Sequence, residues 1–240
     1  MMLEKKIILA VGGAQGIGRA TAKLCSARGG QVIIADIDPA AGTQTASEIG
    51  STFIMVNVAD ETSVQNMISL INHAYGRLDV LIQTAGILSG AYTPLDEFTV
   101  ETFRAVLDVN ITGSFLCVKH CVPLMKKAGG GVVILTSSDA AISGSPSYAF
   151  GTSKGGISSF AISIAHMLEQ DNIRVNVIAP GNIDTGMKRS LLAIDAERRG
   201  ANFEQVVREA KLGTPDGVAK VIAWLASDDA NYVRGIINTR

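Results

Sequence analysis

Short runs of aliphatic and β-branched residues alternate with longer amphipathic segments, and this alternation constrains the fold more than any other feature. The short runs are typical of strands, and the segments between them have the length and periodicity of helices. Near-continuous apolar strands indicate a parallel sheet buried on both faces, and crossovers of this length are right-handed. We therefore predict an α/β fold, a doubly wound parallel sheet with helices on both faces. The predicted strands are 6–11, 31–36, 52–58, 78–85, 131–137 and 173–180, and the predicted helices are 17–29, 39–49, 61–75, 99–127, 152–170 and 216–227.

The length and charge of the chain limit its organisation and its partners. Its 240 residues suit one domain, and no Pro/Ser-rich or single-sign charged run marks a linker. The net charge is −1 with acidic and basic residues interspersed, which argues against nucleic acid and against a membrane as partners. The N-terminal apolar run is too short for a signal peptide, and no apolar run reaches the ~18 residues of a membrane span. We expect a cytoplasmic protein.

The three cysteines, Cys25, Cys117 and Cys121, fall in apolar segments with helical periodicity. We predict buried free thiols, which fit a reducing compartment. Cys117 and Cys121 share a helix face, but no neighbouring group of His and Cys completes a ligand set, so we predict no metal site.

A glycine-rich stretch, Gly12-Gly13-Ala14-Gln15-Gly16-Ile17-Gly18, follows the first predicted strand and opens the first predicted helix. Glycines at 12, 16 and 18 allow a sharp turn, close approach to a pyrophosphate and tight helix packing, and the helix N-terminus favours phosphate. An ordinary strand–helix turn has a similar composition, so the position after the first strand carries the argument. We predict that Gly12, Gln15, Gly16, Ile17 and Gly18 bind a dinucleotide.

Asp36 ends the second predicted strand, 18 residues after Gly18. A carboxylate there accepts hydrogen bonds from the adenosine-ribose hydroxyls and repels a 2′-phosphate. Asp38 competes for this role, and helix capping is the alternative role for either residue. No Arg or Lys occupies 13–17 or 36–40, so we predict NAD rather than NADP as cofactor.

These motifs resemble the short-chain dehydrogenase/reductase family, and the likeness extends from about residue 5 to 237. The resemblance implies a single NAD(P)-binding Rossmann domain over 1–240, in which hydride passes between nicotinamide and a carbinol or carbonyl carbon. Val11 departs from the family's usual Thr, and Gln83 and Thr84 depart from its usual Asn-Asn. The further cofactor contacts that the resemblance implies are Asn57 and Val58 at adenine, Ala85 and Gly86 in QTAG, Pro180 and Gly181 in APGNIDT, and Ile183 N–H and Thr185 at the nicotinamide carboxamide.

The resemblance also implies a catalytic group. Asn110 matches the helix Asn that holds a proton-relay water, and a serine in ILTSSDAA orients the substrate oxygen. Registry along the strand places that serine at Ser138, whereas counting back from position 150 leaves Ser137 open. Lys154 matches the lysine that binds the nicotinamide ribose and lowers the pKa of a Tyr four residues earlier. That position holds Phe150, which has no proton to exchange.

Two other residues are candidates for the missing proton donor. Tyr148 lies six residues before Lys154, and we expect it in a turn before the helix, on a different side. Asp139 follows the serine pair, where a solvated or capping role is the simpler interpretation.

We predict an NAD(H)-dependent oxidoreductase that interconverts a secondary alcohol and a ketone, captured as an inactive Tyr-to-Phe form. The presence of Asn110, Ser138 and Lys154 favours this interpretation, because a site without proton transfer has little need of a lysine beneath an apolar ring. The alternative is a natural relative without redox activity, either an NAD-binding regulator or an isomerase or cyclase that reuses the pocket.

Residues 185–214 form a long segment after the sixth predicted strand, and we expect a mobile lid over the substrate. Lys188 and Arg189 are candidates to meet an anionic substrate, with a solvated basic turn as the alternative. Leu88, Ile142 and Leu191–Leu192 suggest an apolar pocket wall. Helices 99–127 and 152–170 are apolar beyond one stripe, and the resemblance implies a homotetramer, or at least a homodimer, built on them.

Overall fold

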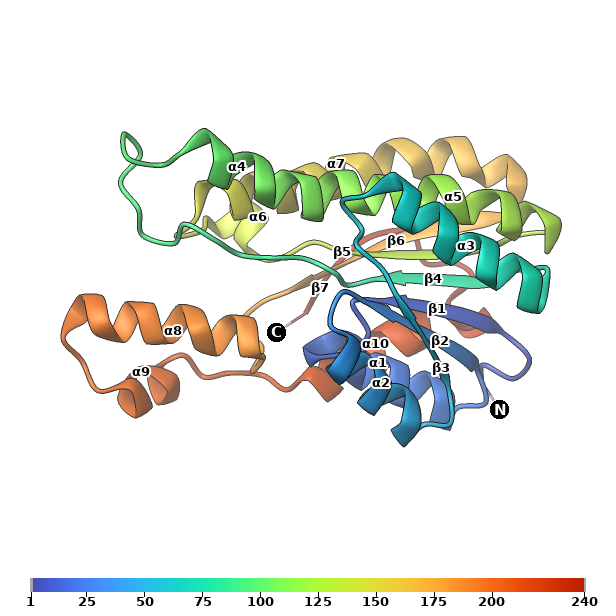
Figure 1. The fold of residues 1–240 in the computed structure, drawn as a ribbon, viewed down its shortest axis with the longest axis horizontal. Coiled ribbons are helices and arrows are strands. Elements are labelled where there is room, and N and C mark those ends of the chain that lie inside the picture. The colour runs from blue at the N-terminus through green and yellow to red at the C-terminus, as the bar shows by residue number, and fades with distance from the viewer. Residues whose placement is uncertain (1, 240) are drawn as a thin grey trace.

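Seven parallel strands form one sheet in the order β3-β2-β1-β4-β5-β6-β7 in the computed structural model, which describes residues 2–239 (Figure 1). The strand order reverses between β1 and β4, so the two halves of the sheet meet there, as in a doubly wound fold. The predicted α/β fold is therefore confirmed. The strands are β1 (Ile7–Val11), β2 (Gln31–Asp36), β3 (Thr52–Met55), β4 (Val80–Gln83), β5 (Gly131–Thr136), β6 (Ile173–Pro180) and β7 (Gly235–Thr239).

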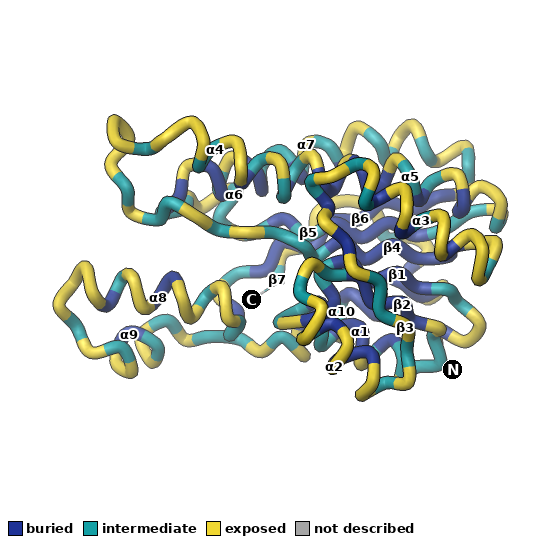
Figure 2. Tube along the Cα trace, viewed as in Figure 1, coloured by how far each residue is buried: buried dark blue, intermediate teal, exposed yellow. Residues whose placement is uncertain are grey.

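Helices cover both faces of the sheet, and successive residues of a strand serve opposite layers. Ile8 and Ala10 of β1 pack into one buried cluster, whereas Leu9 and Val11 pack into the other. Both faces are apolar, which explains why the inner strands β1, β2, β4, β5 and β6 are largely buried apolar runs and appear dark blue in Figure 2. The edge strands β3 and β7 are intermediate or exposed. One layer holds α1 (Gly16–Ala27), α2 (Pro39–Glu48) and α10 (Pro215–Leu225), and the other holds α3 (Glu61–Tyr75), α5 (Gly113–Lys127) and α7 (Tyr148–Leu168).

The helix predicted over 99–127 is not continuous. It consists of α4 (Val100–Leu107), a π-helical segment (Asp108–Thr112) and α5, and its first turn is capped by the Thr99 hydroxyl. Such π segments are rare and occur frequently at functional sites. Here the wider turn carries Asn110, whose side chain is fully buried.

The helix predicted to begin at residue 152 begins at Tyr148. The hydroxyl of Ser147 accepts a hydrogen bond from the Phe150 N–H at 3.3 Å, which caps the helix and starts it earlier. The expectation that Tyr148 lies in a turn before this helix was therefore wrong.

Two parts of the fold were not predicted as elements. β7 pairs in parallel with β6 at the edge of the sheet, and its run of apolar residues is too short to stand out in the sequence. Residues 185–214 form two helices, α8 (Gly186–Arg199) and α9 (Phe203–Glu209), which pack through Leu192, Ala196 and Val206 and extend away from the sheet (Figure 1). The remaining helices are α6 (Ala140–Ser143) and two 3₁₀ turns, Glu169–Asp171 and Asp228–Ala230.

The helical stretch Val100–Lys127 reaches the length and mean hydropathy of a membrane span, although the sequence was expected to contain no apolar run of that length. The same composition suits a core helix of a soluble protein. Cys117, Cys121 and Met125 of α5 are fully buried in the cluster between this helix layer and the sheet. All three cysteines are free and buried, as predicted.

Candidate active site

A cavity of about 550 Å³ opens at the carboxyl ends of the strands and collects nearly all of the predicted site residues. This is where parallel α/β sheets bind their ligands. Among the residues predicted to bind the cofactor or to form the catalytic group, Asn110 is the one that does not line the cavity. Those that do are Gly12, Gln15, Gly16, Ile17, Gly18, Asp36, Asn57, Val58, Ala85, Gly86, Ser138, Phe150, Lys154, Pro180, Gly181, Ile183 and Thr185.

Close backbone packing requires glycine at two positions of the loop after β1. A Cβ on Gly12 would lie 2.4 Å from the Ala85 nitrogen, and Gly12 has a φ of +75°, which disfavours other residues. A Cβ on Gly18 would lie 2.0 Å from the Gly12 carbonyl oxygen. The glycines therefore bring the loop, the first helix and the end of β4 together beneath the cavity.

Asp36 and Asp38 have different roles. Asp36 lines the cavity and accepts hydrogen bonds from the Ala14 N–H at 3.0 Å and from the Asp38 N–H at 3.1 Å. Asp38 caps α2 and accepts a hydrogen bond from Gln15 Nε2 at 3.1 Å. Of the two competing carboxylates, Asp36 is thus the one at the cavity. The neighbouring Ile37 also lines the cavity with 66% of its surface exposed.

Asn57 and Val58 form the wall of the cavity after β3. Asn57 accepts a hydrogen bond from the Ala59 N–H at 3.1 Å, and its own N–H donates to the Ser63 hydroxyl at 3.0 Å. These bonds hold the loop between β3 and α3 in place.

Asn110 connects the cavity wall to the helix that carries Phe150 and Lys154. Its Oδ1 accepts from the Ile87 N–H at 2.8 Å, and its Nδ2 donates to the Ile87 carbonyl at 3.0 Å and to the Ser153 hydroxyl at 2.9 Å. Ser153 in turn donates to the Phe150 carbonyl at 2.8 Å. The side chain of Asn110 is thus a structural link one layer behind the cavity.

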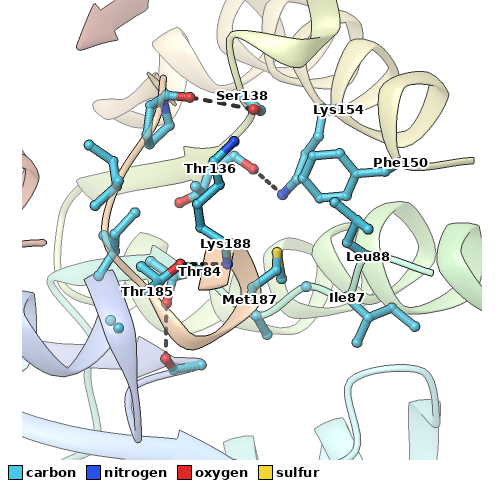
Figure 3. Close-up of a pocket in the computed structure, with 18 of the residues that line it drawn as sticks. Thr84, Ile87, Leu88, Thr136, Ser138, Phe150, Lys154, Thr185, Met187 and Lys188 are labelled. Carbon is cyan, nitrogen blue, oxygen red and sulfur yellow. Dashed lines mark hydrogen bonds between the residues drawn. The ribbon is translucent and has the colours of Figure 1, made fainter. Parts of the chain in front are cut away.

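Lys154 is buried beside Phe150. Its Nζ donates to the Thr136 carbonyl at 2.8 Å and lies 5.4 Å from the centre of the Phe150 ring (Figure 3). Burial lowers the pKa of the Lys154 ammonium from 10.5 to about 8. No carboxylate among residues 2–239 forms an ion pair with it, and Lys154 lines the cavity.

The two serines after β5 are clearly distinguished. The Ser137 hydroxyl donates to the Lys154 carbonyl at 2.7 Å and accepts from Ser158 at 2.9 Å. Both partners lie on helix α7, so the hydrogen bonds of this hydroxyl are already made within the protein. The Ser138 hydroxyl makes one long bond, 3.4 Å, to the Pro180 carbonyl and accepts from the Ala140 N–H. The geometry therefore favours Ser138 as the hydroxyl available to a ligand.

Neither candidate substitute for a tyrosine hydroxyl is well placed. Tyr148 does not line the cavity, and its ring packs edge-to-face on Phe98 with centroids 5.3 Å apart. Asp139 lines the cavity but accepts a hydrogen bond from the Ser143 hydroxyl at 3.0 Å and is exposed.

The apolar wall at the end of the cavity expected to hold the substrate differs in part from the prediction. Leu88 and Leu191 line it as predicted, but Ile142 is 76% exposed and Leu192 is buried between α8 and α9. Ile142 lies within the short helix α6, on the side that faces solvent. Sequence periodicity does not reveal so short a helix.

Several residues that line the cavity were not predicted as site residues, among them Ile37, Thr84, Thr136 and Met187. Thr84 donates to the Val11 carbonyl at 2.8 Å and so fastens the end of β4 to the end of β1. The signal for Thr84 in the sequence was that it stands where the family usually has Asn. An apolar residue directly after Asp36 was the available signal for Ile37.

Comparison with known proteins agrees with this geometry. The sequence model of a family described as enoyl-(acyl carrier protein) reductase, within the short-chain dehydrogenases/reductases, matches residues 12–238. An uncharacterised oxidoreductase of Thermotoga maritima is 35% identical over 98% of this chain and 93% of its own length. Secoisolariciresinol dehydrogenase of Forsythia intermedia is 35% identical over 97% of this chain and 86% of its own. The crystal structure of levodione reductase has a TM-score of 0.92 at 26% identity and covers 98% of this chain and 96% of its own.

The chain belongs to the short-chain dehydrogenase/reductase family, and it is a member of a family of oxidoreductases. The predicted resemblance is thereby confirmed at the level of the family.

Proposed function

We propose that this protein is an NAD(H)-dependent oxidoreductase that interconverts a secondary alcohol and its ketone. One observation carries the proposal: a single cavity joins the Asp36 carboxylate at one end to Ser138 and Lys154 at the other. A cavity of about 550 Å³ falls within the range of small-molecule and cofactor sites. The names of its relatives, a dehydrogenase and a reductase, agree with either direction of the reaction.

The residues present fit a dinucleotide. The glycine loop leaves backbone N–H groups at the N-terminus of α1, where phosphates are stabilised, and Asp36 presents a carboxylate to ribose hydroxyls. A 2′-phosphate would meet that carboxylate without a cation at 13–17 or 36–40, which supports NAD over NADP. Ile183, Thr185 and Lys154 would hold the nicotinamide end. When bound, the nicotinamide accepts or supplies the hydride.

The chain's own residues then act on the substrate oxygen. Ser138 donates a hydrogen bond to it, and Lys154 supplies positive charge beside it. In this reading Phe150 occupies the position of the proton-transferring tyrosine, so the present chain is an impaired form. The burial of Lys154 supports the view that position 150 belongs to a proton-transferring tyrosine. A buried ammonium without an ionisable neighbour to act on only lowers the stability of the protein.

The second candidate is a natural relative that performs no redox reaction, either a regulator or an isomerase or cyclase. The observation in its favour is that Tyr148 packs on Phe98 and Asp139 on Ser143, so neither is set to replace the missing acid.

A matched pair of proteins separates the two candidates. This chain and its Phe150→Tyr variant are assayed with NAD⁺ and NADP⁺ over a panel of secondary alcohols, with Phe150→Leu as the control for ring packing. We expect only Phe150→Tyr to reduce NAD⁺. If all three are silent while NADH still binds, the non-redox candidate gains, and products of unchanged oxidation state become the readout.

We also propose a small-molecule substrate, a cytoplasmic location and a homo-oligomer, a dimer or tetramer, built on α5 and α7. Phe115 of α5 is 45% exposed and stacks edge-to-face with Phe160 of α7, and Ile162 and Met167 of α7 are also exposed. Light scattering on the purified protein should give two or four times the mass of 25.1 kDa; a monomer contradicts this part of the proposal.

A further inference from the structure

Lys188 brings a positive charge to the substrate end of the cavity. It lies in the first turn of α8, lines the cavity, and its side chain extends into the cavity with the ε-amino group on the Ser138 side (Figure 3). The charged residues that line the cavity within 2–239 are Asp36, Asp139, Lys154 and Lys188. Asp36 lies at the end of the cavity expected to hold the nucleotide. In the half expected to hold the substrate, the two lining cations are Lys154 and Lys188.

Within residues 2–239, no acid forms an ion pair with Lys188. Among the cations of 185–214, it alone combines a half-buried side chain with the absence of an ion pair. Its neighbour Arg189 is paired with Asp184 at 2.6 Å and is exposed. The acid that acts on Lys188 through space is Asp195, which Arg198 already pairs at 2.8 Å.

The surroundings make this unpaired charge costly. Burial lowers the pKa of the Lys188 ammonium below its ordinary value, as expected for a cation partly removed from water. Met187, Leu88 and Leu191 supply apolar walls around the same end of the cavity. A partly desolvated cation in an apolar pocket is best stabilised when an anion arrives with the ligand.

We propose that Lys188 anchors a carboxylate on the substrate, so that the substrate is a hydroxy or oxo acid with an apolar carbon skeleton. This inference rests on the proposed function and names the substrate class of that site. A single lysine matches a monoanion. A phosphate dianion would call for more than one free cation, and in this half Arg189 is paired and the proposed function already places Lys154 at the nicotinamide and the substrate oxygen.

The test compares two probes of equal shape, cyclohexanecarboxylate and cyclohexanecarboxamide, by calorimetry and ligand-observed NMR. Each is titrated into the protein alone and into the protein saturated with NADH. We expect the carboxylate to bind about 10- to 100-fold more tightly than the carboxamide, the range for a hydrogen bond to a charged group. Lys188→Met should remove the difference, and Lys188→Arg should retain part of it.

Lys211→Met is the matched control, because Lys211 belongs to the same segment, is exposed and does not line the cavity. It should leave the preference for carboxylate unchanged.

Equal affinities for the two probes, no binding of either, or a Lys188→Met effect that weakens both probes alike would overturn the inference. So would a Lys188→Met variant that loses NADH affinity and keeps the preference, since Lys188 would then serve the cofactor. If the parent protein prefers carboxylate but binds no NADH, the proposed function fails and the anion site stands. If it binds NADH without any preference, only the anion site fails.

Discussion

Replacing Asn110 by alanine should loosen the cavity wall at Ile87 from helix α7. The Asn110 side chain makes three hydrogen bonds, two to the backbone of Ile87 and one to Ser153. Ile87 lines the cavity, and Ser153 lies on α7 one residue before Lys154. Asn110→Ala therefore removes every side-chain bond that joins these two parts through the π-helical segment.

The size of the effect follows from what remains unpaired. Asn110 is fully buried, so its removal leaves a small cavity together with the N–H and C=O of Ile87. A buried polar group without a partner costs about 1–3 kcal/mol. Ile87 is 38% exposed, so water recovers part of that cost. We therefore expect Asn110→Ala to lower the free energy of unfolding by about 2–4 kcal/mol.

Equilibrium unfolding in urea measures this change, and two variants calibrate it. Ser153→Ala removes one of the three bonds to Asn110 together with the bond from Ser153 to the Phe150 carbonyl, and it should cost about 1–2 kcal/mol. Asn231→Ala alters an exposed Asn and should change stability by less than about 0.5 kcal/mol. A loss for Asn110→Ala no larger than that for Ser153→Ala would refute the argument that Asn110 links wall and helix.

Three further changes should be measurable. Asp36→Ala should weaken NADH binding by roughly 10- to 100-fold and NADPH binding by less, because a charged acceptor for the ribose is lost; equal losses in fluorescence titrations would count against it. The unfolded chain binds more protons than the native chain between the native Lys154 pKa of about 8 and its ordinary value of 10.5. As the pH rises from about 8 to 10.5, the unfolding free energy of the parent should therefore increase by about 3 kcal/mol relative to that of Lys154→Met. A difference between the two proteins that does not change with pH would contradict this prediction. Burial raises the pKa of the Cys25 and Cys117 thiols to about 12 and that of Cys121 well above its ordinary value, so a thiol reagent should label all three only after urea unfolding; rapid labelling of the native protein would be the contrary result.

Most of the sheet was predictable from the sequence because its inner strands are buried apolar runs between turn signals, whereas the edge strand β7 is largely exposed and was not predicted. The strand predicted over 173–180 matches β6 at both ends, since all of its residues are buried. The glycine loop and Asp36 were predictable for a related reason. Their place at the cavity follows from their position at the ends of β1 and β2, which the strand pattern already gives.

Other features depend on contacts that sequence periodicity does not carry. The early start of α7 depends on one side-chain cap, Ser147, within a stretch whose composition suits a turn. The outward position of Ile142 depends on the short helix α6. The choice between Ser137 and Ser138 depends on Ser158, which lies on another element and occupies the first of the two hydroxyls.

Lys188 illustrates the same limit at the substrate end. The sequence offers Lys188 and Arg189 as equivalent neighbours. The structure separates them, because Asp184 pairs with Arg189 and leaves Lys188 in the cavity. Side-chain pairing over a few residues thus decides which cation can meet a ligand.

In the proposed function, Phe150 removes the proton-transfer step from an otherwise intact hydride-transfer site. Its most direct test is the rate at which a ketone oxidises bound NADH in a single turnover, measured for this chain and for Phe150→Tyr. We predict that the two proteins bind NADH with affinities within a few-fold and that Phe150→Tyr reacts ~10²–10⁴ times faster, the contribution of a general acid. Equal rates in the two proteins, with NADH bound equally, would contradict the proposed role of Phe150.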